Sequence, residues 1–137
     1  MSGPLVLDTG AFVALVDRSE ERHADCVARL AEWEGSVVTT EAVLTETLHL
    51  VGPAWRAQRV CLEFFTRGSF QLVASSQESL RRVAALMEQY GDVPMDFADA
   101  TLVVLAEELR VDQIFTLDRR GFSIYQLGGN VSFRIIP

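Results

Sequence analysis

Short runs of apolar residues alternate along the chain with longer stretches in which apolar residues recur every three or four positions. The short runs predict β-strands and the longer stretches predict amphipathic helices, because side chains alternate along a strand and repeat every 3.6 residues around a helix. The expected strands cover residues 4–8, 37–40, 70–73, 113–118 and 131–136. The expected helices cover residues 11–16, 19–34, 41–51, 54–67 and 76–90, and a sixth follows Pro94.

This alternation predicts a three-layer α/β/α sandwich. Strands that are connected through helices run parallel, and a parallel sheet carries helices on both of its faces. Its strands are then apolar on both sides, as in Leu5-Val6-Leu7 and Val37-Val38. No internal repeat or linker divides the chain. We therefore expect a mainly parallel sheet of about five strands in a single domain, residues 1–137.

Two of the helices carry specific expectations. Ser19 is expected to cap the helix over residues 19–34, because a serine hydroxyl can accept a hydrogen bond from an amide of the first turn. The inner side of this helix is predicted to consist of Ala24, Val27, Ala28, Leu30 and Ala31. The helix after Pro94 is apolar on nearly all sides over residues 102–106, so we expect protein to surround it.

Size and composition fit an ordered domain without a membrane segment. Of the 137 residues, 49% are hydrophobic, which is enough to bury a core. No apolar run reaches the roughly 20 residues needed to span a bilayer, and the N-terminus lacks the pattern of a signal peptide. Cys26 and Cys61 have no metal-site spacing and suggest reduced, buried thiols. These features predict a cytoplasmic protein.

The charge of the chain is strongly acidic. A net charge of −7 weighs at first sight against a nucleic-acid partner. Charge counts do not record placement, however, and acids gathered around a divalent cation repel nothing once that cation is bound. All 12 basic residues are arginines, so any mechanism that requires a lysine is excluded.

Acidic residues stand at the ends of predicted strands and in the helices beside them. Asp8 and Asp118 end the first and fourth strands, Asp96 and Asp99 open the sixth helix, and Glu46 lies in the third helix. Sites in open parallel sheets form beyond the carboxyl ends of the strands, so these carboxylates could converge. Clustered carboxylates need compensation, for which a hard divalent cation such as Mg²⁺ or Mn²⁺ is suited. The inferred chemistry is metal-dependent hydrolysis of a phosphodiester.

Each of these acids also has a purely structural interpretation. Asp8 and Asp118 could accept hydrogen bonds from turn amides, and Glu46 could be an exposed helix acid. Asp96 suits a helix N-cap, and Asp99 would then be the third helical residue, where an acid suits the helix dipole. Spacing alone does not decide between these interpretations and a metal site.

Four segments, taken in order, resemble the PIN-domain family and most closely the VapC-type toxins of bacterial toxin–antitoxin pairs. They are Leu7-Asp8-Thr9-Gly10-Ala11-Phe12, Glu46 in the third helix, Met95-Asp96-Phe97-Ala98-Asp99-Ala100, and Thr116-Leu117-Asp118-Arg119-Arg120-Gly121-Phe122. The resemblance implies a Mg²⁺- or Mn²⁺-dependent endoribonuclease with the catalytic acids Asp8, Glu46, Asp99 and Asp118. Asp8, Asp99 and Asp118 would hold metal, with Asp96 matching an additional acid of some members. It further implies a small antitoxin partner and commonly a homodimer.

Around these motifs, one departure and four further candidates stand out. Family members often carry an acid beside the position of Gly121, where this chain has glycine, so the number of metal ions, one or two, stays open. Thr9 and Thr116 are candidates for placing water or phosphate, and Arg119 and Arg120 for holding RNA phosphates. Structural threonines and solvated surface arginines are the alternatives.

Two other functions compete with the nuclease. A phospho-receiver domain also groups acids at strand ends, but this class resembles proteins with an acid pair after the first strand and a lysine after the last. The chain has Asp8 alone and no lysine. A non-catalytic or regulatory PIN domain, binding RNA or acting as a scaffold, is the second alternative, and the intact set of four acids weighs against it.

Overall fold

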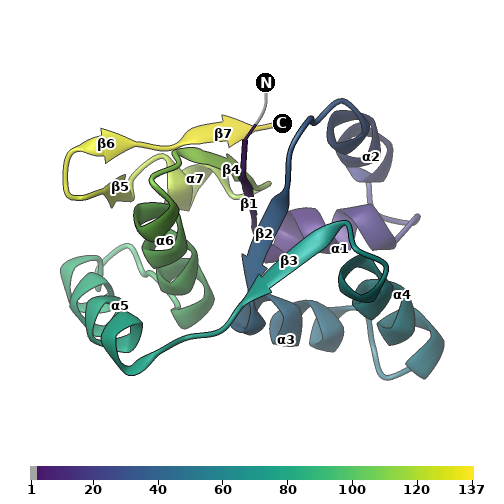
Figure 1. Ribbon diagram of the computed structural model, residues 1–137, viewed down its shortest axis with the longest axis horizontal. Helices are drawn as coiled ribbons and strands as arrows, with labels where there is room; N and C mark the ends of the chain where they lie inside the picture. Colours follow the sequence, from purple (N-terminus) through teal and green to yellow (C-terminus); the bar gives the residue numbers. More distant parts are fainter. Residues whose placement is uncertain (1–2) are drawn as a thin grey trace.

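A five-stranded parallel sheet runs through the centre of the molecule (Figure 1). The computed structural model describes residues 3–137. The strands are β1 (Leu5–Leu7), β2 (Val37–Thr40), β3 (Phe70–Val73), β4 (Gln113–Phe115) and β7 (Arg134–Ile136). They lie in the order β3-β2-β1-β4-β7, and each neighbouring pair is parallel. The predicted α/β fold with about five parallel strands is confirmed.

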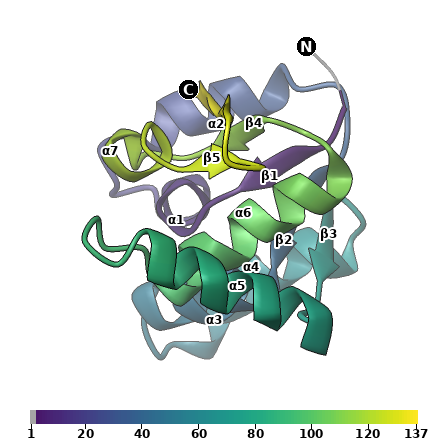
Figure 2. The ribbon, with the colours of Figure 1, turned by 90° about the vertical axis from the view of Figure 1, so that its left-hand side faces the viewer.

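Within residues 3–137, seven helices flank the sheet: α1 (Thr9–Val16), α2 (His23–Ala31), α3 (Glu41–Leu50), α4 (Trp55–Thr66), α5 (Gln77–Gln89), α6 (Phe97–Leu109) and α7 (Arg119–Phe122). Helices α5 and α6 cover one face, while α1, α2 and α4 lie on the other side (Figure 1). Figure 2 shows α6 between α5 and the sheet. This position explains why α6 is apolar all round, with residues 100–106 buried. None of the helices within residues 3–137 combines the length and the apolarity that crossing a membrane requires.

The strand order reverses between β1 and β4, and this reversal places the candidate site. The chain first builds outward from β1 to β2 and β3, then returns to add β4 and β7 on the other side of β1. The carboxyl ends of β1 and β4 are therefore neighbours, and the Asp8 amide donates to the Phe115 carbonyl at 3.0 Å. In open α/β sheets a crevice forms at such a reversal point.

Besides the apolar side chains of the strands, the core contains a cluster of phenylalanine rings and the two cysteines. The Phe12 ring lies 5.6–5.8 Å from the rings of Phe64, Phe65 and Phe70, which joins α1, α4 and β3. Aromatic pairs at such distances stabilise beyond their buried area. Both cysteines are free and buried, as predicted from their spacing.

The second helix differs from the prediction. It begins at His23 rather than Ser19, because the Ser19 hydroxyl and amide both donate to the Asp17 carboxylate at 2.6 and 2.9 Å. The Ser19 hydroxyl is thereby held in a turn and does not cap a helix. Cys26 is the buried residue of α2 and Leu30 is half-buried. The predicted inner positions Ala24, Val27, Ala28 and Ala31 are exposed, so that assignment is wrong.

The end of the chain is also divided differently. The predicted strand over residues 131–136 is two strands, β6 (Val131–Ser132) and β7, and β6 pairs antiparallel with β5 (Gln126–Leu127). Residues 119–122 form the short helix α7, which the apolar pattern did not predict.

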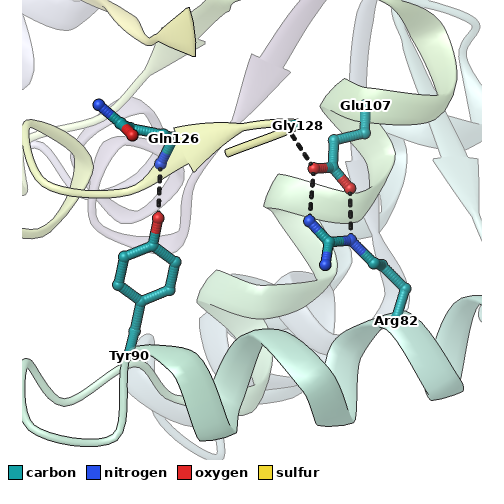
Figure 3. Close-up of polar contacts among 5 residues, drawn as sticks. All are labelled: Arg82, Tyr90, Glu107, Gln126 and Gly128. Carbon is teal, nitrogen blue, oxygen red and sulfur yellow. Dashed lines mark hydrogen bonds and ion pairs between the residues drawn. The ribbon is translucent and has the colours of Figure 1, made fainter. Parts of the chain in front are cut away.

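The β5–β6 hairpin is fastened to α5 and α6 by polar contacts (Figure 3). The backbone amide of Gln126 donates to the Tyr90 hydroxyl at 3.0 Å, and the backbone amide of Gly128 donates to the Glu107 carboxylate at 2.8 Å. Arg82 donates twice to Glu107, at 3.0 and 2.9 Å. Burial disfavours the charge of Glu107, but the Arg82 and Gly128 bonds outweigh it and hold the Glu107 pKa below its ordinary value. These anchors fix the segment that leads from α7 into β5.

Candidate active site

Asp8 is the acid at the carboxyl end of β1. It caps α1, and its side chain is 7% exposed. One carboxylate oxygen accepts from the Thr9 amide at 2.8 Å, and the other accepts from the Thr116 hydroxyl at 2.7 Å. The turn interpretation of Asp8 is therefore correct, but it accounts for only one of the two oxygens. The second oxygen is directed toward the end of β4.

Thr116 connects Asp8 to Asp118. Its buried hydroxyl donates to Asp8 and accepts from the Asp118 amide at 2.9 Å. The Asp118 carboxylate in turn accepts from the Gly121 amide at 3.0 Å and so caps α7. A single threonine thus fixes the backbone of one acid and the side chain of another, across 108 residues of sequence between Asp8 and Thr116.

Asp96 and Asp99 form a capping box at the start of α6. Asp96 accepts from the Asp99 amide at 2.8 Å, and Asp99 accepts from the Asp96 amide at 3.4 Å. The capping interpretation of both acids is therefore correct. Asp99 has a further partner, because the Tyr125 hydroxyl donates to its Oδ2 at 3.2 Å. Tyr125 is 1% exposed and lies between α7 and β5.

The electrostatics show that these acids share one region. Burial raises the pKa of Asp8 to about 6, assisted by repulsion from Asp118 and Glu46. Burial also raises the pKa of Asp99 to about 7, with repulsion from Asp96 and Asp8 added. The ion pairs within residues 3–137 include none of these five acids. The negative charge is therefore concentrated and has no arginine partner in the described part of the chain.

The chemistry of this donor set fits a hard divalent cation. All five groups offer carboxylate oxygens, which Mg²⁺ and Mn²⁺ prefer. The raised pKa values of Asp8 and Asp99 reflect negative charge that a cation would compensate. Within residues 3–137, no three His, Cys, Asp or Glu side chains are close enough together to form a ready-made metal cage. The acids therefore share a region with a suitable donor chemistry rather than a preassembled coordination sphere.

The four predicted substrate-binding residues occupy different surroundings. Thr9 is buried, and its hydroxyl has no hydrogen-bond partner within the described residues. Thr116 is occupied by the two acids that it connects. Arg119 donates to the carbonyl of Pro137, whereas Arg120 lines a cavity beside Asp118.

Gly121 and Tyr125 are two site residues whose roles the sequence did not predict. A Cβ on Gly121 would lie 2.7 Å from Asp118 Oδ2 and 3.1 Å from the Tyr125 hydroxyl. The Asp118 carboxylate and the Tyr125 hydroxyl thus occupy the space that a side chain at position 121 would need. Gly121 was noted only as a departure from the family pattern. Tyr125 belongs to no motif, and nothing in the sequence indicates its contact with Asp99, because that contact depends on the path of α7.

The chain belongs to the PIN-domain family. A family model described as PIN domain matches residues 5–127, which is most of the chain. Among characterised proteins, the chain is 30% identical over 138 residues to Ribonuclease VapC26 of Mycobacterium tuberculosis, an alignment that covers 97% of this chain and 100% of that protein. The family resemblance of the four motif segments is thereby confirmed.

Solved structures show the same fold. The crystal structure of VapC20 from Mycobacterium tuberculosis, a toxin that cleaves the sarcin–ricin loop, matches with a TM-score of 0.79 at 15% identity, over 88% of this chain and 95% of that one. VapBC2 from Rickettsia felis, bound to a DNA fragment from its promoter, matches with a TM-score of 0.67 at 14% identity, over 98% of both chains. At these identities the likeness concerns the architecture.

Proposed function

We propose that this protein is a metal-dependent endoribonuclease and the toxin of a type II toxin–antitoxin pair. The observation that carries the proposal is the group of carboxylates at the carboxyl ends of β1 and β4, where burial and repulsion raise the pKa of Asp8 to about 6 and that of Asp99 to about 7. Perturbed acids without a cationic partner, gathered at the reversal point of a parallel sheet, are characteristic of a catalytic centre. The names of VapC26 and VapC20 support RNA as the substrate.

Asp8, Glu46, Asp99 and Asp118 are the proposed catalytic acids. Asp8, Asp99 and Asp118 would hold Mg²⁺ or Mn²⁺, and Asp96 would add its second oxygen, since the first accepts the Asp99 amide. When bound, such an ion supplies a water of lowered pKa and balances the charge on the phosphate under attack.

The residues around the acids orient them before any substrate arrives. Thr116 holds the Asp8 carboxylate and the Asp118 backbone, and the Tyr125 hydroxyl holds the Asp99 carboxylate in the first turn of α6. Each hydroxyl donates to a carboxylate oxygen, which favours the ionised form of that acid against its burial. Catalytic groups gain most from neighbours that fix their geometry in advance, and these two hydroxyls have that role.

The proposal includes the partners of the protein. We propose that a small antitoxin protein blocks the acidic site and that the toxin is a homodimer; the likeness to the VapBC2 structure supports the antitoxin partner. The cytoplasm is the proposed location, because the free, buried cysteines Cys26 and Cys61 suit a reducing compartment.

The decisive experiment is a cleavage assay on structured RNA. Purified protein is incubated with Mn²⁺, with Mg²⁺ or with EDTA, beside the Asp8→Asn variant. The nuclease predicts fragments that require both the metal and Asp8. Equal background in every tube removes the enzyme and leaves the non-catalytic or regulatory PIN domain. Binding of Mn²⁺ by isothermal titration, weakened in Asp8→Asn, tests the metal site without relying on turnover.

A second experiment addresses the toxin role. Induced expression should arrest the growth of a bacterial host, Asp8→Asn should not, and co-expression of a DNA-binding protein from an adjacent short reading frame should relieve the arrest. Cleavage in vitro without any arrest would retain the nuclease and exclude the toxin.

A further inference from the structure

A cavity opens beside Asp118, on the side of the acids that faces α7 and the segment before α6. Its volume is about 700 Å³, within the range of about 300–1,000 Å³ that is usual for ligand pockets. Besides Asp118 and Gly121, it is lined by Asp92, Val93, Pro94, Arg120, Ile124 and Tyr125. Most of these residues lie outside every motif of the sequence. The cavity therefore extends the acidic site in one direction.

One wall of the cavity is apolar and accessible. Ile124 is 48% exposed, although a large aliphatic side chain usually avoids water. Pro94 is also exposed and Val93 is half-buried, so that the wall is made from two segments about 30 residues apart in sequence. An apolar surface of this kind suits the face of a nucleobase better than it suits a phosphate.

The charge of the cavity is divided between two acids and one arginine. Arg120 is the basic residue among its described lining, and Asp92 and Asp118 are the acidic ones. None of the ion pairs found in residues 3–137 involves Arg120. Its neighbour Arg119 is directed to the Pro137 carbonyl instead. An anion that enters an acid-lined cavity needs a cation, and Arg120 is placed to provide it.

We propose that this cavity binds the RNA nucleotide next to the scissile bond, on the Asp118 side. The phosphate of that nucleotide is held by Arg120, and its base lies against Ile124 and Pro94. The assignment rests on the proposed ribonuclease function and adds to it a subsite in which Arg120, Ile124 and Pro94 contact the substrate. Phosphate contacts position RNA, while contacts with an unstacked base influence which nucleotide is accepted. Ile124 and Pro94 are thus assigned to base preference.

The test measures RNA affinity separately from cleavage. Arg120→Gln and Ile124→Ala are placed in the Asp8→Asn background, and binding of a fluorescent single-stranded RNA is followed by anisotropy. The same substitutions in the otherwise unaltered chain give KM and kcat with Mn²⁺. We expect each to raise the Kd and the KM about tenfold, equal to about 1.4 kcal/mol, with kcat within about threefold of the parent protein. Thermal melts should be unchanged, because both side chains are exposed.

Matched variants on α5 control for charge and apolar area. Arg81→Gln removes an equal charge from an exposed helix position, and Leu80→Ala removes a side chain that is 42% exposed. If these controls change affinity as much as Arg120→Gln and Ile124→Ala do, the subsite is wrong. An equal loss from Arg119→Gln would also overturn the assignment to this cavity. If the unaltered chain cuts no RNA, the proposed function fails instead, and the anisotropy series still decides whether the cavity binds RNA.

Discussion

Replacing Gly121 by alanine should inactivate the site while leaving the fold intact. The added Cβ would lie 2.7 Å from Asp118 Oδ2, whereas ordinary contacts begin at 3.4 Å, so the carboxylate must move by about 0.7 Å. The Tyr125 hydroxyl, at 3.1 Å, must also give way. One methyl group therefore disturbs an acid of the proposed site and the tyrosine that orients another.

The magnitude follows from the precision that catalysis requires. A misplacement of about 1 Å can lower a rate about 100-fold, which corresponds to about 2.7 kcal/mol of barrier. A shift of about 0.7 Å predicts a loss between about 10-fold and 100-fold for Gly121→Ala. Stability should change little. Gly121 lies in α7 without a positive φ, so alanine gains up to about 1 kcal/mol of helix propensity against a weakened bond to Asp118 of similar size.

The assay compares initial cleavage rates with Mn²⁺ and melting temperatures for Gly121→Ala and for the control Gly91→Ala. The Cβ of the control would meet only backbone oxygens at 3.4 and 3.5 Å, which are ordinary contacts. Cleavage by Gly121→Ala at the parental rate would refute the claim that the Asp118 carboxylate must stay where it is. A large fall in its melting temperature would refute the claim that the damage is confined to the site.

Three further outcomes are expected. Thr116→Val should lower the free energy of unfolding by about 1–3 kcal/mol in chemical denaturation, because it leaves the Asp118 backbone amide without a hydrogen-bond partner. The control Thr47→Val should be neutral or stabilising, because the buried Thr47 hydroxyl has no partner in the described chain. Without metal, the melting temperature should fall as the pH rises from about 4 to 7. Asp8 and Asp99 have pKa values of about 6 and 7 in the folded protein against an ordinary 3.8, so the folded state binds more protons than the unfolded state over this range. A pH dependence of the melting temperature that is unchanged in Asp8→Asn would contradict this. Glu107→Gln should lower stability by about 1 kcal/mol above pH 5, where the parental carboxylate is ionised. The difference in denaturant midpoint should shrink as the pH falls through the lowered pKa of Glu107, and a loss of equal size at pH 3 and pH 7 would show that the charge is not responsible.

The architecture was predictable because apolar periodicity and strand connectivity are local properties that add up along the chain. Short apolar runs joined by helices allow few arrangements besides a parallel sheet. In a parallel sheet the carboxyl ends of the strands share one edge, so the acids that follow β1 and β4 lie close together. The capping role of Asp96 and Asp99 was also readable, since N-caps have a fixed spacing. What is local in sequence was thus predicted well.

The errors arose where a side-chain contact that the apolar pattern does not reveal overrides a local preference. Serine is a residue type that often caps helices, but the Ser19 hydroxyl is bonded to Asp17 instead. The alanines of α2 carry too little apolar area to decide which face of the helix turns inward. Tyr125 was missed because its value depends on a hydrogen bond to Asp99, 26 residues away. Gly121 stood out only as a departure, and the clash that requires glycine there appears when Asp118 and Tyr125 are both in place.

The bond between Thr116 and Asp8 has a consequence for the synthesis of the protein. Asp8 leaves the ribosome 108 residues before its partner Thr116, and Asp118 and Tyr125 follow later still. Until the segment after β4 has left the exit tunnel, a nascent chain lacks Asp118 and the two hydroxyls that orient Asp8 and Asp99. On the proposed ribonuclease function, a nascent chain that ends before Thr116 would be inactive toward the ribosome and the message that make it.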